Sequence, residues 1–376
     1  MATTVYLNGK FTAQTTTGVQ RVARCLVEAL DRGLAGGSAG PASTLRWVLL
    51  CPPGGRLPAL RQVETRVIGG GRGGLHVWEQ WTLPRAARDG LLVNLAGSAP
   101  AWAGRQVCTL HDAAVFDRPE TYSFVFGAWY RWLFRRLART AVAIHTVSDF
   151  SRQRLAARLA IEPGRIAIVP NGGDHLRNAT ADPAVLVEAG LVGQRFVLAV
   201  GSASATKNFA ALIAGFATLA DADLRLVIAG GHHAAVFAPV GDVASEAADR
   251  RVVRIGWVGD SELKALYGAA AVLVFASLYE GFGLPPLEAM SCDCPVVGAS
   301  TSAVPEVCGD AALYVDPASP ADIARGLARV LGDAALAADL VKRGQARLAH
   351  FTWDSSAARL RTLLEPLAAR PAAGRG

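Results

Sequence analysis

Residues 279–290 read YEGFGLPPLEAM, and this stretch sets two acids, Glu280 and Glu288, on either side of two glycines and two prolines. It follows the apolar run AVLVFAS at 271–277, which predicts a buried strand. Proline suits the first turn of a helix because its missing N–H costs nothing there. We therefore expect a helix that begins at Pro286 and carries Glu288 in its first turn.

The same succession of strand, loop and helix recurs along the chain. The expected strands are 4–8, 45–50, 91–95, 106–110, 142–147, 166–170, 195–201, 224–230, 251–257, 271–277 and 294–299. The expected helices are 19–33, 126–140, 209–220, 260–269, 320–331 and 353–369. Alternating patterns in both halves predict an α/β chain with two doubly wound, Rossmann-like domains.

A polar stretch without a strand pattern lies between Asn171 and Gln194 and marks the break between these domains. We expect an N-terminal domain over 1–175, a linker over 176–193 and a C-terminal domain over 194–350. The remaining helix and tail, 351–376, are expected to pack back on the N-terminal domain.

Composition narrows the class of protein. With 376 residues, 51% hydrophobic and 18% charged, the chain can bury a sizeable core. Residues 1–10 lack a basic segment followed by an apolar one, so we expect no signal peptide and a cytoplasmic location. The net charge is +7, but no nucleic-acid motif occurs, so we expect no nucleic-acid partner. The pair Cys292 and Cys294 has no histidine near it in sequence, and we expect small buried thiols and no metal.

The loop GSASATKNF at 201–209 follows a predicted strand and opens a predicted helix. Backbone N–H groups and the helix dipole at such a loop favour an anion. Lys207 lies where the dipole disfavours a cation, and a bound phosphate would relieve that conflict. The alternative is a solvated surface lysine, and this segment alone leaves both open.

The acids of 279–290 also allow two interpretations. Glu288 could accept two hydrogen bonds from a vicinal diol such as a ribose, and Glu280 would lie over the pocket. Alternatively, Glu288 only stabilises the helix dipole and Glu280 is solvated. Gly281 and Gly283 permit close approach of a ligand to the loop.

The segment SLYEGFGLPPLEAM resembles the signature of the retaining GT-B glycosyltransferases of family 4, which carry two glutamates separated by seven residues around this turn. The flanking segments VRIGWVGDSELKALYGAAAVLVFAS and AVPEVCGDAALYVDP resemble the same family, as do TTGVQRVARCLVEAL, TLHDAAVF, HTVSDFSR and IVPNGGD in the first half. The resemblance covers nearly the whole chain in the expected order. It implies that the two domains face each other across a cleft. It also implies that 194–350 is the nucleotide-sugar donor domain and 1–175 the acceptor side.

The resemblance also implies roles for single residues. The implied donor-binding set is Gly18, Gly201, Ser202, Lys207, Val258, Asp260, Phe282, Gly283, Leu284 and Glu288. Within it, Glu288 would bind the ribose and Lys207 would neutralise the leaving diphosphate. Glu280 would hold the donor sugar as a catalytic residue together with Lys207 and His111, and Gln20 would lie toward the acceptor.

One departure from the family concerns charge. Family members usually add an arginine directly after the loop glycine or directly before the lysine, where this chain has Ser202 and Thr206. A close charge pair in a partly wet site is worth a few kcal/mol. Either another arginine, such as Arg21 or Arg24, replaces it, or the activity is weak or lost.

The resemblance implies chemistry without a metal or other cofactor. The only D-x-D that could hold a divalent metal is Asp221 and Asp223, which precede the strand at 224–230. Ligands bind at the carboxyl ends of such strands, so these acids lie at the wrong end and are interpreted as a turn.

The segment 121–140 combines aromatic residues with Arg131, Arg135, Arg136 and Arg139. A helix with this pattern could rest on an anionic membrane surface, but the interpretation we favour from the sequence is a buried helix with a wet basic edge.

The leading hypothesis is a retaining, metal-independent transferase of bacterial surface polysaccharide synthesis. It would move a hexose, with a weak preference for mannose from GDP-mannose, from a nucleotide sugar to a glycan or lipid-linked acceptor. The alternatives are a nucleotide-sugar epimerase on the same fold and a non-catalytic subunit that binds nucleotide sugars.

Overall fold

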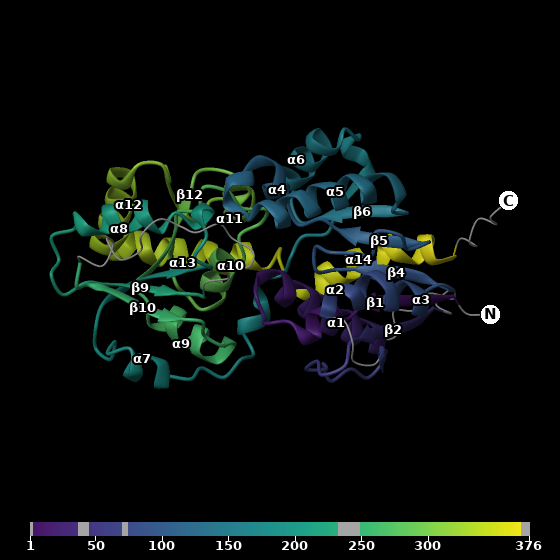
Figure 1. Cartoon of the computed structure of the whole chain (residues 1–376). Coiled ribbons are helices and arrows are strands. Elements are labelled where there is room, and N and C mark those ends of the chain that lie inside the picture. The colour runs from purple at the N-terminus through teal and green to yellow at the C-terminus, as the bar shows by residue number, and fades with distance from the viewer. Residues whose placement is uncertain (1–2, 37–44, 70–73, 232–248, 370–376) are drawn as a thin grey trace.

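The computed structural model describes residues 3–36, 45–69, 74–231 and 249–369. Two lobes stand side by side, the first purple to blue and the second mostly green, and each is built on its own sheet (Figure 1). The prediction of an α/β chain with two doubly wound sheets is confirmed. No helix among the described residues is both long and apolar enough to cross a bilayer.

The first sheet has the strand order β3-β2-β1-β4-β5-β6-β7 in the described part of the chain. Its strands are β1 (Thr4–Asn8), β2 (Arg46–Cys51), β3 (Glu64–Val67), β4 (Leu91–Asn94), β5 (Gln106–Thr109), β6 (Ala143–Thr146) and β7 (Ile166–Ile168). The pairings are parallel, with Val5 of β1 opposite Trp47 on one side and Leu91 on the other. The sequence did not predict β3, whose residues are half-buried or exposed at the edge of the sheet.

The second sheet has the order β10-β9-β8-β11-β12-β13 within the same described ranges. Its strands are β8 (Phe196–Val200), β9 (Arg225–Ala229), β10 (Val252–Gly256), β11 (Val272–Phe275), β12 (Val296–Ala299) and β13 (Leu313–Val315). The sequence missed the three-residue edge strand β13. The central strands β8 and β11 read as continuous apolar runs because helices cover both faces of a parallel sheet.

Helices cover both sheets. Those of the first lobe are α1 (Gly18–Ala35), α2 (Gly74–Val77), α3 (Leu83–Ala86), α4 (Ala114–Asp117), α5 (Phe124–Thr140) and α6 (Asp149–Leu159), with the short turns η1 (Lys10–Ala13), η2 (Trp78–Thr82), η3 (Pro119–Thr121) and η4 (Pro163–Arg165). The later ones are η5 (Asp174–Leu176), α7 (Ala184–Glu188), η6 (Ala205–Lys207), α8 (Phe209–Ala217), α9 (Asp260–Ala269), α10 (Leu284–Ser291), α11 (Val304–Cys308), α12 (Pro320–Gly332), α13 (Ala334–Leu348) and α14 (Trp353–Ala369).

The helix α1 shows why these segments fold as they do. Val22, Leu26 and Leu30 recur at four-residue spacing and form its buried face. This face packs with the C-terminal helix α14, drawn yellow against the first lobe in Figure 1. An ion pair between Arg32 and Asp354 joins the same two helices.

The order of the strands indicates where a ligand would bind. In each sheet the direction of strand addition reverses beside the first strand, between β1 and β4 and between β8 and β11. Loops leaving the carboxyl ends of such neighbouring strands diverge and leave a crevice where ligands bind. The loop at 201–207 follows β8 and the loop at 276–283 follows β11, so both lie at this point of the second sheet.

Candidate active site

Lys207 and Glu280 meet at the reversal point of the second sheet. The Lys207 Nζ atom lies 2.6 Å from Glu280 Oε1 and 5.1 Å from the centroid of the Phe275 ring. The stem of Lys207 crosses Gly201, where an added Cβ would come within 3.0 Å of the lysine Cδ. Gly201 therefore keeps the lysine close to the loop, and the ammonium group has further protons to offer an anion.

Hydrogen bonds join the two loops to each other. The backbone N–H of Leu278 donates to the Thr206 carbonyl at 2.8 Å. Asn208 adopts a left-handed conformation, with φ of 59°, and its side-chain amide donates to the carbonyls of Ala276 and Pro317. Ser202 lies half-buried in the same loop, and its carbonyl accepts from the N–H of Ser204. The loop that carries Lys207 is thus held against the loop that carries Glu280.

The helix α10 begins earlier than the sequence predicted. It runs over Leu284–Ser291, so Glu288 lies in its second turn and no acid lies in the first. Gly283 caps the helix with φ of +93°, a conformation that a side chain would disfavour, and the prediction of a start at Pro286 missed this. The interpretation of Glu288 as a first-turn acid is therefore wrong. The side chains of Phe282 and Leu284 are buried in the core, so only the backbone of these residues could contact a ligand.

Glu288 is buried and surrounded by donors. Its Oε2 accepts from the Tyr267 hydroxyl at 2.9 Å, and its Oε1 lies 3.1 Å from Arg21 Nη1 and 3.2 Å from His175 Nε2. Burial alone would raise the pKa of Glu288, but His175 and the charge of Arg21 outweigh it and lower the pKa to about 2. The Trp353 indole donates to His175 Nδ1, so Nδ1 is the accepting nitrogen and Nε2 carries a proton toward the carboxylate. Glu288 is thus a fixed, ionised acceptor.

Arg21 links the first lobe to this acid. Its guanidinium pairs with both Glu288 and Asp260, and Asp260 begins α9 of the second lobe. Nearby, the Trp257 indole donates to the Thr16 carbonyl at 3.2 Å. Val258 lies half-buried between Trp257 and Asp260. Trp257 and Asp260, on either side of Val258, therefore lie where the two lobes meet.

Gly18 and Gln20 lie in the first turn of α1. A Cβ added to Gly18 would meet no atom within 4 Å, so the backbone there is open. Gln20 contacts Thr17 and Gln14 of its own loop. The structure brings neither residue into recorded contact with Lys207 or Glu288.

Gly281 brings the second lobe against His111. A Cβ at Gly281 would lie 2.6 Å from the His111 carbonyl oxygen, so a larger residue would push the lobes apart. The hydroxyls of Ser148 and Ser151 donate to the Gly281 carbonyl at 2.6 and 3.0 Å. Glu280 and His111, both predicted as catalytic, therefore lie on segments that contact each other across the cleft.

His111 is neutral at physiological pH. Burial lowers its pKa to about 4, and the hydrogen bond with the Leu95 carbonyl acts in the opposite direction. A carbonyl oxygen only accepts, so Nε2 carries the proton at 3.0 Å from Leu95 and Nδ1 keeps its lone pair. His111 can accept a hydrogen bond from a ligand hydroxyl but holds no charge.

The structure also adds residues that the sequence did not single out for the site. Asp112 follows His111, and burial together with the charge of Glu280 raises its pKa to about 6. Tyr267 lies two turns after Asp260 on α9, a spacing that places both on one helix face and could have drawn attention to it. His175 directly follows the quoted segment IVPNGGD, but no local pattern relates it to Glu288.

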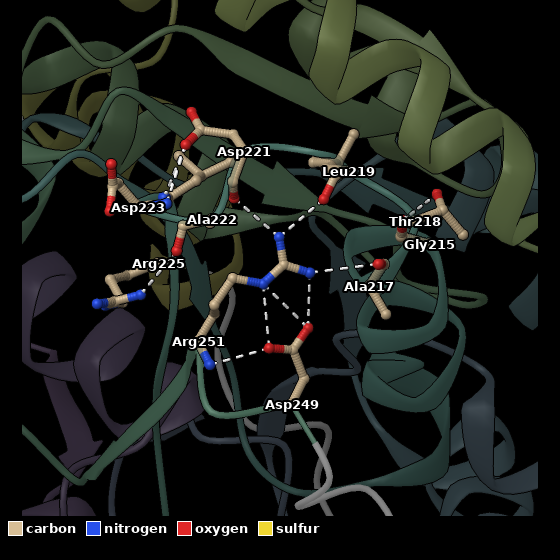
Figure 2. Close-up of polar contacts among 11 residues, drawn as sticks. Gly215, Ala217, Thr218, Leu219, Asp221, Ala222, Asp223, Arg225, Asp249 and Arg251 are labelled. Carbon is tan, nitrogen blue, oxygen red and sulfur yellow. Dashed lines mark hydrogen bonds and ion pairs between the residues drawn. The ribbon is translucent and has the colours of Figure 1, made fainter.

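Asp221 and Asp223 form a turn, as the sequence predicted. The Asp221 carboxylate accepts from the N–H groups of Asp223 and Leu224, just before β9 begins. Figure 2 shows this turn beside Arg251, which donates to the carbonyls of Leu219 and Asp221. Among the residues that the structure describes, no three His, Cys, Asp or Glu side chains form a group that could hold a metal ion.

Comparisons with known proteins identify the family of the chain. A family model for glycosyl transferases group 1 matches residues 188–347, and one for glycosyltransferase family 4 matches residues 16–177. The O-antigen chain mannosyltransferase B of Escherichia coli is 30% identical over 257 residues, which are 67% of this chain and 68% of that one. This chain belongs to the family 4 glycosyltransferases. The resemblance of the 279–290 segment to that family is thereby confirmed.

A further relative and a solved structure are similar to this glycosyltransferase. The O-antigen chain mannosyltransferase RfbU of Salmonella typhimurium is 27% identical over 215 residues, 56% of this chain and 57% of that one. The alignment thus spans little more than half of RfbU. The solved structure of Anabaena HepE with UDP-glucose covers 98% of the glycosyltransferase and 100% of HepE, with a TM-score of 0.71 at 15% identity, which shows a shared fold.

Proposed function

We propose that this glycosyltransferase is a retaining, metal-independent mannosyltransferase of bacterial polysaccharide synthesis that uses GDP-mannose. The observation that carries the proposal is the placement of two glutamates about α10. Glu280 pairs with Lys207 at one end, and Glu288 is buried and ionised in the second turn. The mannosyltransferase names of both curated relatives support the choice of sugar.

The donor would lie along α10. Glu288 would accept the two ribose hydroxyls, because its pKa of about 2 keeps it an acceptor at every physiological pH. Lys207 and the backbone N–H groups of Ser202, Gly283 and Leu284 would hold the diphosphate, with Gly18 facing it from the first lobe.

The sugar would lie between the lobes. Glu280 would accept from its hydroxyls while remaining paired with Lys207, and the free Nδ1 of neutral His111 would accept another. Gln20 would lie on the acceptor side. Breaking the bond to the anomeric carbon builds negative charge on the diphosphate, and preorganised donors with a cation lower that barrier.

The nucleotide base would contact Val258 and Asp260. A carboxylate can accept from the N–H groups of guanine, which favours GDP over UDP. HepE holds UDP-glucose in its own structure, so UDP-glucose is the competing donor to test.

An exposed aromatic surface supports a lipid-linked acceptor at a membrane. Phe124 and Val125 at the start of α5 are 83% and 78% exposed, and the ring of Trp132 on the same helix lies 5.6 Å from that of Trp102. Trp102 and Trp81 line an open pocket of about 440 Å³.

Arginines surround this surface. Arg85, Arg88 and Arg105 line the same pocket, and Arg135 and Arg139 are exposed on α5. Aromatic side chains beside arginines suit the interface of an anionic bilayer. We therefore propose that the enzyme rests on the cytoplasmic face of a membrane through this surface. Arg131 and Arg136 instead donate to the carbonyls of Val115 and Ala101 and stabilise the lobe itself.

The test is a donor panel with membrane-extracted lipid-linked glycan as acceptor. The proposal expects GDP release and mannose transfer from GDP-mannose, with little UDP release from UDP-glucose and a strongly reduced rate with Lys207→Ala. Sugar interconversion without acceptor would indicate the epimerase alternative. Tight nucleotide binding without transfer from either donor would indicate a non-catalytic subunit.

A further inference from the structure

Arg21 crosses the cleft to the place where the ribose is proposed to bind. It lies in the first turn of α1, and its guanidinium reaches Glu288 Oε1 through Nη1 and Asp260 Oδ1 through Nη2. The side chains of Arg21 and Glu288 are 14% and 3% exposed, whereas that of Asp260 is 52% exposed. The arginine thus closes the entrance to a buried carboxylate from the opposite lobe.

Arg21 is the partner of Glu288 that a ligand can displace. Tyr267 and His175 lie on α9 and η5, which pack against each other and against α10, so they hold Glu288 from the elements that surround it. A carboxylate offers about four lone-pair positions, and the hydrogen bonds from Tyr267 and Arg21 use two of them, while His175 Nε2 lies 3.2 Å from Oε1. A ribose diol needs two positions, so it competes with the partner that comes from the other lobe.

The charges of the site give a displaced Arg21 a second partner. Lys207 is already paired with Glu280 at 2.6 Å, so the named groups set two cations against three carboxylates. A nucleoside diphosphate adds negative charge to this cluster, so it competes with the carboxylates for the cations that are already there. An arginine fork suits phosphate oxygens because it donates two parallel hydrogen bonds. Arg21 also begins beside the open backbone of Gly18.

We propose that Arg21 is a positioning residue with two places. In the empty enzyme it occupies the ribose place on Glu288 and Asp260, and in the donor complex it turns to the diphosphate and completes its charge neutralisation. This inference rests on the proposed donor site. Binding of the nucleotide would thus replace the contact of Arg21 with the second lobe by a contact with the leaving group.

The test compares ligands with and without phosphates. Guanosine, GDP, uridine and UDP are titrated by calorimetry into the wild type and Arg21→Gln. The variant should bind the nucleosides roughly 5-fold more tightly, because a competitor is gone, and the nucleoside diphosphates at least ~10-fold more weakly, because a charged hydrogen bond is lost. The opposite signs distinguish this role from a merely structural one, which would shift both ligands in the same direction.

Arg24→Gln is the matched control. Arg24 lies one turn further along α1 and contacts Glu28 and the Arg56 carbonyl within its own lobe, so its loss should change none of the four affinities. If Arg21→Gln does not fold, Arg21→Lys carries the test, because lysine lacks the fork that bridges two carboxylates. Nucleosides should again bind more tightly, and the diphosphates should keep most of their affinity.

Two results separate the inference from the proposed function. A wild type that binds neither diphosphate overturns the donor site and this inference with it. A wild type that binds GDP or UDP, with Arg21→Gln unchanged for both ligand classes or weaker for both, overturns the inference alone.

Discussion

The Nζ atom of Lys207 lies 2.6 Å from Oε1 of Glu280, and the two residues come from loops that leave neighbouring parallel strands. The lysine is therefore held by a carboxylate before any ligand arrives. A diphosphate that gains charge as it leaves would then be met by a cation already in position, which costs little reorganisation.

Replacing this lysine should act on turnover. Lys207→Ala should lower the rate at saturating donor by at least ~100-fold, about 2.7 kcal/mol, because the interaction strengthens as the bond breaks. Initial rates of nucleoside diphosphate release measure it, and Lys342→Ala, an exposed lysine on α13, is the control. Near-normal turnover would mean that another group neutralises the diphosphate and would remove Lys207 from the mechanism.

Adding an arginine beside the lysine should restore part of the loss. Thr206→Arg or Ser202→Arg places a second cation in the loop at 201–207, so either change should raise the rate of the Lys207→Ala enzyme. The four rates of the double-mutant cycle report the coupling. Strictly additive effects would argue that the two positions do not serve one anion.

The pH dependence of stability should reveal the raised pKa of Asp112. Its pKa is raised to about 6 in the folded protein from the ordinary 3.8, so the folded state holds its proton more tightly. Its contribution to stability is present below pH 3.8 and is lost as pH rises through about 6. Asp112→Asn should therefore raise the Tm relative to the wild type at pH 8 and not at pH 3.5. An equal difference at both pH values would show that Asp112 titrates normally.

Chelation should not stop transfer. The proposed site neutralises the diphosphate with Lys207, and the acidic pair Asp221 and Asp223 is engaged in a turn before β9. Rates measured with EDTA and with added Mg²⁺ should agree. Loss of turnover in EDTA that Mg²⁺ or Mn²⁺ restores would contradict the metal-independent mechanism.

Binding to anionic membranes should depend on the aromatic surface. Trp132→Ser with Trp102→Ser should reduce flotation with phosphatidylglycerol vesicles several-fold, since aromatic rings supply much of the interfacial binding. Val187→Ser with Val192→Ser removes two exposed apolar residues outside this surface and should leave flotation unchanged. Equal losses in both pairs, or none in either, would place the membrane contact elsewhere.

The sequence predicted the sheets and the loops of the site, but not the side chains that meet across the cleft. The proximity of Lys207 and Glu280 could be predicted because each residue follows an apolar run, and the carboxyl ends of parallel strands share one edge of the sheet. Arg21 and Glu288 are 267 residues apart, and their contact depends on how the lobes meet, which no local pattern encodes. The start of α10 was misplaced because the cap at Gly283 depends on a positive φ, which the proline signal does not report.

The binding of nucleoside diphosphates to Glu288→Ala tests the central claim most directly. Calorimetry with GDP and UDP should show affinity lower by roughly 1 to 3 kcal/mol than in the wild type, the value of a charged hydrogen bond. Glu365→Ala on α14 should bind as the wild type does, since its carboxylate pairs with Arg361 within that helix. An unchanged affinity of a folded Glu288→Ala would contradict the assignment of the ribose to Glu288.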